Sequence, residues 1–307
     1  MVSELLSLPG AVAGGGIDAG VAAHYGSFNV EQRTLVSGEG FVDLSHRDVV
    51  RIFGPDRLTW LHSLTSQYFE GLEAGAWTAA LILSPQGHIE HFFHGVDDGT
   101  AFTAWTEPGA GEGLAAYLDR MRFWSDVEVT LDPSLATVWR PVAGYSFIPR
   151  ESLRAYVDAA GPACGMWAFE ALRIERGEPR IGVDTDHRTI PNELGLVGTH
   201  LDKGCYRGQE TVARVHTLGR PPRRLVMLHL DGSENRLPAA GSPLVGPDGR
   251  EVGFVGSSAR HFELGPIALG LVKRSVPVDA PLSVDGMPAA QEVVVDPEVG
   301  LHVRPLR

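Results

Sequence analysis

A change of pattern at Pro221-Pro222 constrains the fold of this chain more than any other sequence feature. Before it, helical and strand-like segments follow one another without a regular alternation. After it, short apolar runs are separated by Gly, Pro and Asp-Gly turns, and no helical periodicity appears. We therefore predict an α+β region over residues 1–220 and a small antiparallel barrel or sandwich over residues 221–307.

Apolar spacing and turn residues locate individual elements in the first region. Leu114, Tyr117 and Leu118 have the spacing of one helix face, two other segments show similar spacing, and a fourth segment is read as a helix closed by Gly177. The four helices are predicted within residues 54–67, 111–124, 151–161 and 166–177. Ser84-Pro85-Gln86-Gly87 predicts a hairpin turn between two strands. The first twenty residues, rich in Gly and Ala, are expected to be mobile.

The formal net charge of −12 argues against general binding to nucleic acids or anionic membranes. Residues 203–224 nevertheless contain six basic residues and one acidic residue, Glu210. This local excess favours an anion site for a carboxylate-rich ligand or a short RNA contact. A solvated basic face is the alternative explanation.

Two cysteines, Cys164 and Cys205, are too few for a disulfide framework in 307 residues, which favours a reducing compartment. The amino-terminal segment has no basic start, and no apolar run approaches the ~20 residues of a membrane helix. We expect a cytoplasmic protein.

The segment "DKGCYRGQE", residues 202–210, places Cys205 between two bases. If the segment is extended, Lys203, Cys205 and Arg207 lie on one face, and the positive charges lower the pKa of the thiol. Gly204 and Gly208 allow the backbone to bend or to approach a ligand. The alternative is a small apolar side chain beside two solvated bases.

Two further segments carry polar candidates. The loop after residue 177 contains Asn192 and Glu193, whose oxygen atoms suit the N–H donors of an aminopyrimidine edge, although an ordinary turn-rich linker would look similar. In "GHIEHFFHG", strand alternation places His88 and His94 on one face and His91 on the other. One face cannot supply three ligands, so no metal site is predicted there.

These segments together resemble a known family. The motif at residues 203–210 is similar to the Lys-Gly-Cys-Tyr-x-Gly-Gln-Glu signature of the folate-binding YgfZ proteins. The segments "GFVDLSHRDVVRIFGPDRLTWLHSLTSQ" and "RIERGEPRIGVDTDHRTIPNELGL" are similar to the related glycine-cleavage T protein, an aminomethyltransferase. The resemblance implies a discontinuous α+β region with two lobes, residues 1–45 with 140–220 and residues 46–139. It also implies a C-terminal β-barrel and a central channel that holds tetrahydrofolate.

The resemblance also implies roles for individual residues, with tetrahydrofolate or a one-carbon derivative as cofactor. Asn192 and Glu193 fall where the family contacts the pterin ring, and Arg173 falls at its Arg-x-Glu-x-Gly position. Cys205 and Lys203 are the expected catalytic residues. The remaining expected cofactor-binding residues are Tyr206, Arg207, Gln209 and Glu210. From their charge, we infer that the basic residues receive the glutamate tail of the folate.

The function implied is support of iron–sulfur client enzymes, including tRNA-modifying ones. Cys205 is then expected to accept a one-carbon unit, to protect a cluster or to exchange a disulfide, and the sequence does not choose among these. A folate-dependent aminomethyltransferase is the alternative, but this chain has Glu90-His91 where the T protein has two adjacent aspartates. A third hypothesis is a binding module that docks tRNA or a protein through basic residues 214–224.

Overall fold

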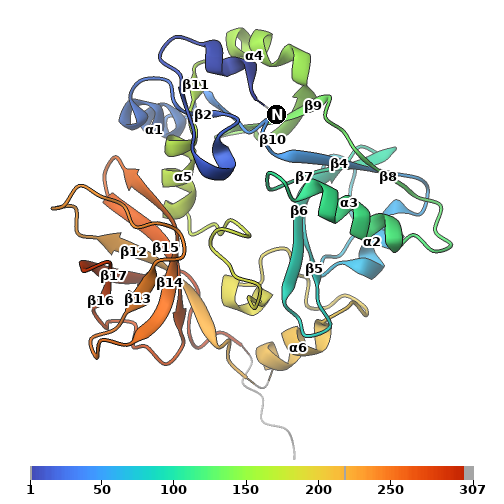
Figure 1. The fold of residues 1–307 in the computed structure, drawn as a ribbon. Helices are drawn as coiled ribbons and strands as arrows, with labels where there is room; N and C mark the ends of the chain where they lie inside the picture. The colour runs from blue at the N-terminus through green and yellow to red at the C-terminus, as the bar shows by residue number, and fades with distance from the viewer. Residues whose placement is uncertain (1, 218, 301–307) are drawn as a thin grey trace, which may run out of the picture. The chain divides into compact units, whose positions relative to one another are not determined.

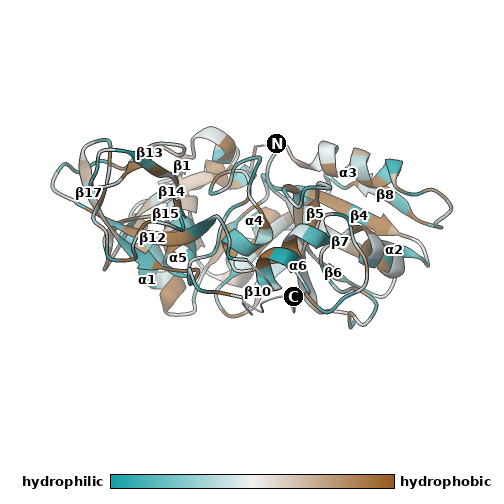
Figure 2. Ribbon diagram, turned by 90° about the horizontal axis from the view of Figure 1, so that it is seen from below, coloured by the Kyte–Doolittle hydropathy of each residue, from teal (hydrophilic) through white to brown (hydrophobic). Residues whose placement is uncertain are grey.

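The last part of the chain folds into a closed barrel of six antiparallel strands, in the order β12-β15-β14-β13-β16-β17 (Figure 1). The structure is a computed structural model and describes residues 2–217 and 219–300. The barrel strands are β12 (Arg223–Leu230), β13 (Pro243–Val245), β14 (Glu251–His261), β15 (Gly265–Lys273), β16 (Leu282–Val284) and β17 (Met287–Val293). Alternate side chains such as Val226, Leu228 and Val284 fill the interior, and Figure 2 shows apolar residues along these strands. The predicted barrel is confirmed.

The chain forms two compact units. The first contains residues 1–61, 69–78 and 93–172, and the second contains residues 62–68, 79–92 and the chain from 173 onward. The predicted boundary at residue 221, the two predicted lobes and the central channel stay predictions.

A four-stranded sheet in the first unit has the order β10-β9-β3-β11. Its strands are β3 (Phe41–Asp43), β9 (Leu135–Arg140), β10 (Gly144–Pro149) and β11 (Ala163–Cys164). The helices of this part of the chain are α1 (Phe28–Val36), α4 (Leu153–Ala160) and α5 (Met166–Glu175). Two of these helices, α4 and α5, confirm predictions from the sequence, whereas α1 was not predicted.

Residues 2–20 form defined secondary structure, whereas a mobile segment was expected. They form the short 3₁₀ helices η1 (Glu4–Ser7) and η2 (Gly16–Asp18), and β1 (Val12–Ala13) pairs with β2 (Ala22–His24). The side chain of Ser3 caps η1 by accepting from Leu5 N, and Leu5 is fully buried against Phe41 and Leu153. One buried leucine and one cap are enough to fix a segment whose composition resembles that of a linker.

The second sheet has the order β5-β6-β7-β4-β8. Its strands are β4 (Asp48–Phe53), β5 (Trp77–Leu83), β6 (Ile89–Asp97), β7 (Ala101–Thr106) and β8 (Glu128–Leu131), and its sequence neighbours are α2 (Arg57–Leu64) and α3 (Gly111–Arg120). Strands β5 and β6 form the predicted hairpin, and Leu114, Tyr117 and Leu118 form the buried face of α3. The second unit contains the far end of this hairpin, residues 79–92.

Between residue 177 and the barrel, the second unit contains the 3₁₀ helix η4 (Pro191–Leu194) and helix α6 (Gln209–Thr217). The sequence did not predict α6. Its Glu210 lies in the first turn and its Arg214 and His216 in the last, where they complement the helix dipole. No helix within residues 2–217 and 219–300 is both long enough and apolar enough to cross a membrane.

Candidate functional site

The segment from Asp202 to Gly208 is irregular and leads directly into α6, all within the second unit. It forms no strand, which was the condition under which Lys203, Cys205 and Arg207 were expected to share one face. Lys203 is buried, whereas Cys205 and Arg207 are exposed. The two basic side chains therefore play different parts.

Lys203 binds backbone at the carboxyl end of α2. Its Nζ donates to the carbonyl oxygens of His62, Thr65 (2.6 Å) and Gln67 (3.2 Å). A cation is favourable at this end of a helix, where carbonyl groups lack partners within the helix. All three hydrogens of the ammonium are thus accounted for, and Lys203 anchors the start of the motif.

Two glycines bring the motif against the hairpin turn. Gly208 has φ +82°, and a Cβ there would lie 2.5 Å from the carbonyl oxygen of Ser84. A Cβ on Gly87 would lie 2.8 Å from the Cβ of Thr211. Both glycines also have a positive φ, so a side chain at either position would be strained as well as crowded. Gly204 differs, since a Cβ there would meet nothing within 4 Å.

Gln209 fixes the backbone just after Cys205. Its Oε1 accepts from Tyr206 N (3.0 Å), while its own N donates to Tyr206 O (3.3 Å). Burial raises the pKa of Tyr206 to about 12, so its hydroxyl is neutral at physiological pH. Glu210, in the first turn of α6, is exposed.

Arg207 pairs with Glu90 of the hairpin. Its Nη1 donates to Glu90 Oε2 over 3.1 Å, and both side chains are about one-third exposed. Glu90 lies on β6 next to the hairpin turn. The carboxylate at this position is therefore engaged by the Cys205 motif itself.

Glu193 is fully buried and held by Arg223. Its Oε1 accepts from Arg223 Nε (2.8 Å), and its Oε2 accepts from Arg223 Nη2 (2.9 Å) and from Ile190 N (3.1 Å). Asp186 takes the other side of the guanidinium, and this hydrogen bond holds the pKa of Asp186 well below its usual range. Burial alone would lower the pKa of Arg223, but its bonds to Glu193 and Asp186 outweigh it, so that pKa is raised.

Asn192 has an unused acceptor. Its Nδ2 donates to Val212 O (3.2 Å), which ties η4 to α6, and its side chain is almost fully buried. Its Oδ1 is buried without a hydrogen-bond partner among the described residues. Asn192 lines a cavity of about 40 Å³ together with His216 and Val299. A buried unpaired acceptor costs roughly 1–3 kcal/mol, so the site favours a donor from outside.

Arg173 is part of a buried network rather than an open site. Its Nη1 donates to Asp184 Oδ2 (3.0 Å) and its Nη2 donates to Ser257 Oγ. Asp184 also accepts from Ser257 N (2.6 Å), which joins the end of α5 to β14. A Cβ on Gly256 would lie 2.1 Å from Asp184 Oδ1, so the glycine before Ser257 is required.

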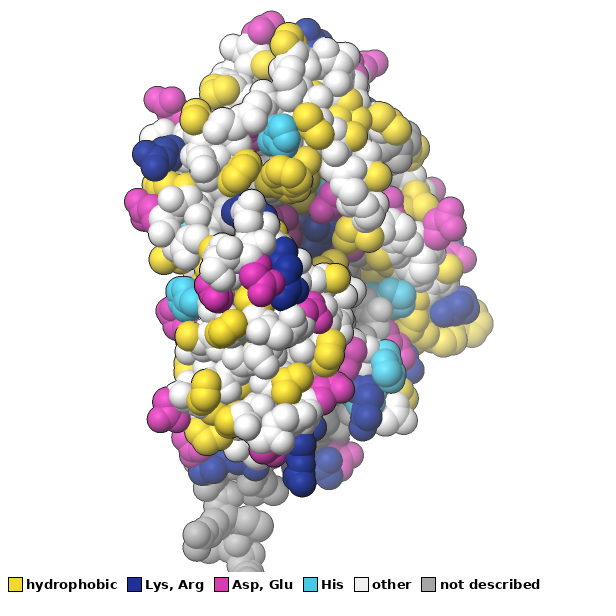
Figure 3. Space-filling view, turned by 60° about the vertical axis from the view of Figure 1, so that its left-hand side comes forward, with side chains coloured by type: hydrophobic (Ala, Val, Ile, Leu, Met, Phe, Trp, Pro, Cys, Tyr) yellow, Lys and Arg dark blue, Asp and Glu magenta, His cyan; other side chains and the backbone are white. Residues whose placement is uncertain are grey.

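The basic run does not form one exposed patch, contrary to the docking hypothesis. Arg224 is fully buried and donates to Gln291 Oε1 (2.7 Å), and Arg223 is held as described. Arg214 and Arg220 are exposed, but Arg220 pairs with Glu298. On the face shown in Figure 3, basic and acidic side chains are interspersed.

The three histidines of the hairpin lie at or on one strand, since His91 and His94 belong to β6 and His88 precedes it. Within residues 2–217 and 219–300, no group of three or more His, Cys, Asp or Glu side chains is arranged to hold a metal ion.

Comparison with known proteins gives relatives in sequence and a match in structure. No family model matches the chain. A chloroplastic protein of Arabidopsis thaliana, named as a candidate transferase, is 25% identical over 315 residues, covering 83% of this chain and 72% of that protein. The tRNA-modifying protein YgfZ of Yersinia enterocolitica is 43% identical over 91 residues, covering 28% of this chain and 27% of its own. The protein of the same name from Escherichia coli is 35% identical over 142 residues, covering 44% and 40%.

The alignments to these two YgfZ proteins span less than half of their length. Among solved structures, the glycine cleavage system aminomethyltransferase T from Bartonella henselae matches with a TM-score of 0.79. The match covers 94% of both chains at 19% sequence identity, which shows a shared fold.

Proposed function

Because this chain is a YgfZ-like protein with the T-protein fold, we propose that it binds a tetrahydrofolate and uses Cys205 to support iron–sulfur client enzymes, including tRNA-modifying ones. The observation that carries the proposal is the way in which the motif presents Cys205. Lys203 is buried on three carbonyl groups, Gly208 is packed on the hairpin turn, and the thiol between them is exposed. A rigid frame around an exposed thiol suits a group that reacts with a partner.

The folate part of the proposal rests on Asn192. Its unpaired Oδ1 matches the N–H donors of a pterin amino edge, and Glu193 beside it is held in place by Arg223. A cavity of about 40 Å³ admits only the edge of such a ring. We therefore assign direct contact to Asn192. Glu193 and Arg173 support the surrounding backbone, and the exposed Arg207 and Glu210 are candidates for the outer part of the ligand.

Calorimetric titration with tetrahydrofolate tests this assignment. We expect Asn192→Ala to weaken binding about tenfold, because a buried hydrogen bond to the ligand is lost. Cys205→Ser should bind folate as the wild type does. Absence of binding by the wild type, or equal affinity in Asn192→Ala, would refute the folate site.

The thiol is tested separately by complementation of a strain that lacks its own YgfZ protein. Cys205→Ser should fail to restore the activity of an iron–sulfur tRNA-modifying enzyme while it still binds folate. Cys164→Ala, which changes the buried cysteine, is the matched control and should complement. Full complementation by Cys205→Ser would exclude a role for the thiol.

A further inference from the structure

Three consecutive polar side chains are buried between β3 and β4 in the first unit. Ser45, His46 and Arg47 are 2%, 6% and 3% exposed. None of them belongs to the motif or to the proposed folate site. Charged and polar side chains are rarely buried to this extent without partners. Any of their polar atoms that lacks a hydrogen bond therefore points to a missing ligand.

Each of the three side chains has at least one polar atom without a partner among the described residues. These atoms are Ser45 Oγ, His46 Nδ1, and Arg47 Nε and Nη1. The Arg47 guanidinium lies 3.9 Å from the centre of the Trp105 ring, and its ion pair with Glu107 is 3.8 Å long. Unpaired buried donors cost roughly 1–3 kcal/mol each, so their clustering favours a bound polar group.

Arg150 lines the same cavity as these three residues, a cavity of about 200 Å³. Its Nε donates to Pro133 O, and its Nη2 donates to Ser45 O (2.8 Å) and Leu135 O (3.1 Å). These partners are neutral carbonyl groups, and Nη1 is buried without a partner among the described residues. No hydrogen bond to a carboxylate therefore balances the positive charge of Arg150 in the described part of the chain.

The acidic residues of this cavity are already occupied. Asp48 accepts from Gly109 N (2.9 Å) and Gly111 N (2.8 Å). Asp132 accepts from Ser134 N (3.0 Å) and pairs with Arg51 over 3.5 Å. The hydrogen-bonding capacity left in the lining consists mainly of donors, which favours an anion.

His46 adds a requirement that separates one oxyanion from another. Its Nε2 lies 2.9 Å from Asp18 Oδ1, and in the tautomer that places the imidazole proton on Nε2, Nδ1 accepts a hydrogen bond. A ligand that satisfies the whole cluster has several acceptor oxygens and one hydroxyl group. A singly protonated phosphate has both, whereas sulfate at neutral pH has no hydroxyl group.

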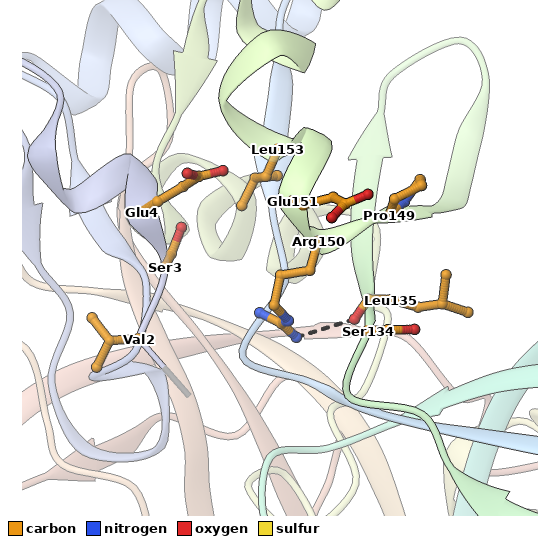
Figure 4. A pocket seen from close by; sticks show the side chains of 9 residues that line it. All are labelled: Val2, Ser3, Glu4, Ser134, Leu135, Pro149, Arg150, Glu151 and Leu153. Carbon is orange, nitrogen blue, oxygen red and sulfur yellow. Dashed lines mark hydrogen bonds between the residues drawn. The ribbon is translucent and has the colours of Figure 1, made fainter.

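Arg150 also lines a larger cavity of about 640 Å³, shown in Figure 4 with its hydrogen bond to the Leu135 carbonyl. The carboxylates of Glu4 and Glu151 line that cavity with Arg150 as its basic residue, whereas both Arg47 and Arg150 line the smaller cavity. The smaller cavity is therefore the better anion site.

We propose that the cavity lined by Ser45, His46, Arg47 and Arg150 binds the phosphate group of a small molecule. Arg47 and Arg150 supply positive charge, Ser45 donates a hydrogen bond, and His46 accepts one from the protonated phosphate oxygen. The volume of about 200 Å³ admits inorganic phosphate or a small phosphomonoester.

Calorimetric titration of the full chain with inorganic phosphate, with chloride at matched ionic strength as reference, tests the site. Ser45→Ala is the decisive variant because Ser45 Oγ has no hydrogen bond to lose in the described structure. We expect it to weaken phosphate binding about fivefold and Arg150→Gln to weaken it at least about tenfold. Arg120→Gln, which removes the same charge from the exposed end of α3, should leave binding unchanged.

Two further titrations define the ligand. Sulfate should bind more weakly than phosphate because it cannot donate to His46 Nδ1. Glycerol phosphate should bind more tightly than inorganic phosphate if the natural ligand is a phosphomonoester, and more weakly if it is free phosphate. Absence of phosphate binding, or equal affinity in wild type, Ser45→Ala and Arg150→Gln, would overturn the proposal. Arg150→Gln also removes three bonds to the backbone, so its fold is checked by circular dichroism, and Ser45→Ala decides if that variant unfolds.

Discussion

The two cysteines of this chain lie in opposite environments. Cys164, in β11 of the first unit, is 1% exposed, and burial raises the pKa of its thiol to about 12. Cys205, in the loop before α6 of the second unit, is exposed. Cys164 thus behaves as a small apolar side chain, and Cys205 is the thiol that a partner can reach.

The two cysteines also differ in which atoms around them are held in place. Around Cys164 the sulfur itself is packed, since a Cβ on Gly40 would lie 3.3 Å from its Sγ. Around Cys205 it is the flanking residues that are fixed, through the bonds of Lys203 and the close packing of Gly208. The comparison teaches that a residue can be held firmly in position without being buried, when its neighbours are anchored.

The largest expected effect is in thiol modification. At pH 8 a thiol with a pKa of about 12 is ionised roughly a thousandfold less than an ordinary thiol, and burial also blocks access. With an aromatic disulfide reagent, the native Cys164→Ala variant should therefore react through Cys205 at least about a thousandfold faster than the native Cys205→Ser variant reacts through Cys164.

Both variants should react quickly once they are unfolded in urea, which controls for the reagent. Comparable rates in the two native variants would remove the contrast between the cysteines. They would also remove the main argument for Cys205 as the reactive group.

The next largest effect is expected in the stability of a variant at Lys203, the residue that anchors the start of the motif. Lys203→Met keeps the length of the side chain but removes three hydrogen bonds to buried carbonyl groups, so we expect a loss of about 3 kcal/mol in the free energy of unfolding. Urea titration followed by circular dichroism measures it. Arg207→Met is the matched control, since its exposed ion pair with Glu90 is worth less than about 1 kcal/mol. An unchanged free energy of unfolding in Lys203→Met would contradict the anchoring role and leave only the catalytic role expected from the sequence.

Periodicity predicted most of the fold, but not the local geometry of the motif. The helices α2, α3, α4 and α5, the hairpin and the barrel all follow from apolar spacing and turn residues. Helix α6 was missed because Val212 is its only fully buried residue, so its apolar face is too narrow to give a pattern. The sequence feature that could have predicted α6 is the acidic Glu210 at its start and the basic Arg214 and His216 at its end.

The candidate site was predicted as a set of residues but not as a set of contacts. Cys205, Asn192 and Glu193 all lie in the second unit, but Glu193 and Arg173 have partners distant in sequence, Arg223 and Ser257. Such pairs depend on the tertiary fold, and no local spacing reveals them. The basic run was misinterpreted for the same reason, because the adjacent Arg223 and Arg224 have different partners, Glu193 and Gln291.

The smallest expected effect is a pH dependence that belongs to Cys164 alone. Its pKa is raised in the folded state, so the contribution of the neutral buried thiol to stability is complete below the unfolded pKa of about 8.5 and is lost as pH rises towards 12. Between pH 8 and pH 10 the unfolded thiol ionises while the folded one does not, and this favours unfolding by about 2 kcal/mol.

The free energy of unfolding from urea titrations at these two pH values isolates this contribution when the wild type is compared with Cys164→Ala. The wild type should lose about 2 kcal/mol more than the variant between pH 8 and pH 10. Cys205→Ser should behave as the wild type does, because its buried thiol is intact. Equal losses in wild type and Cys164→Ala would mean that the thiol of Cys164 ionises as readily in the folded chain as in the unfolded one.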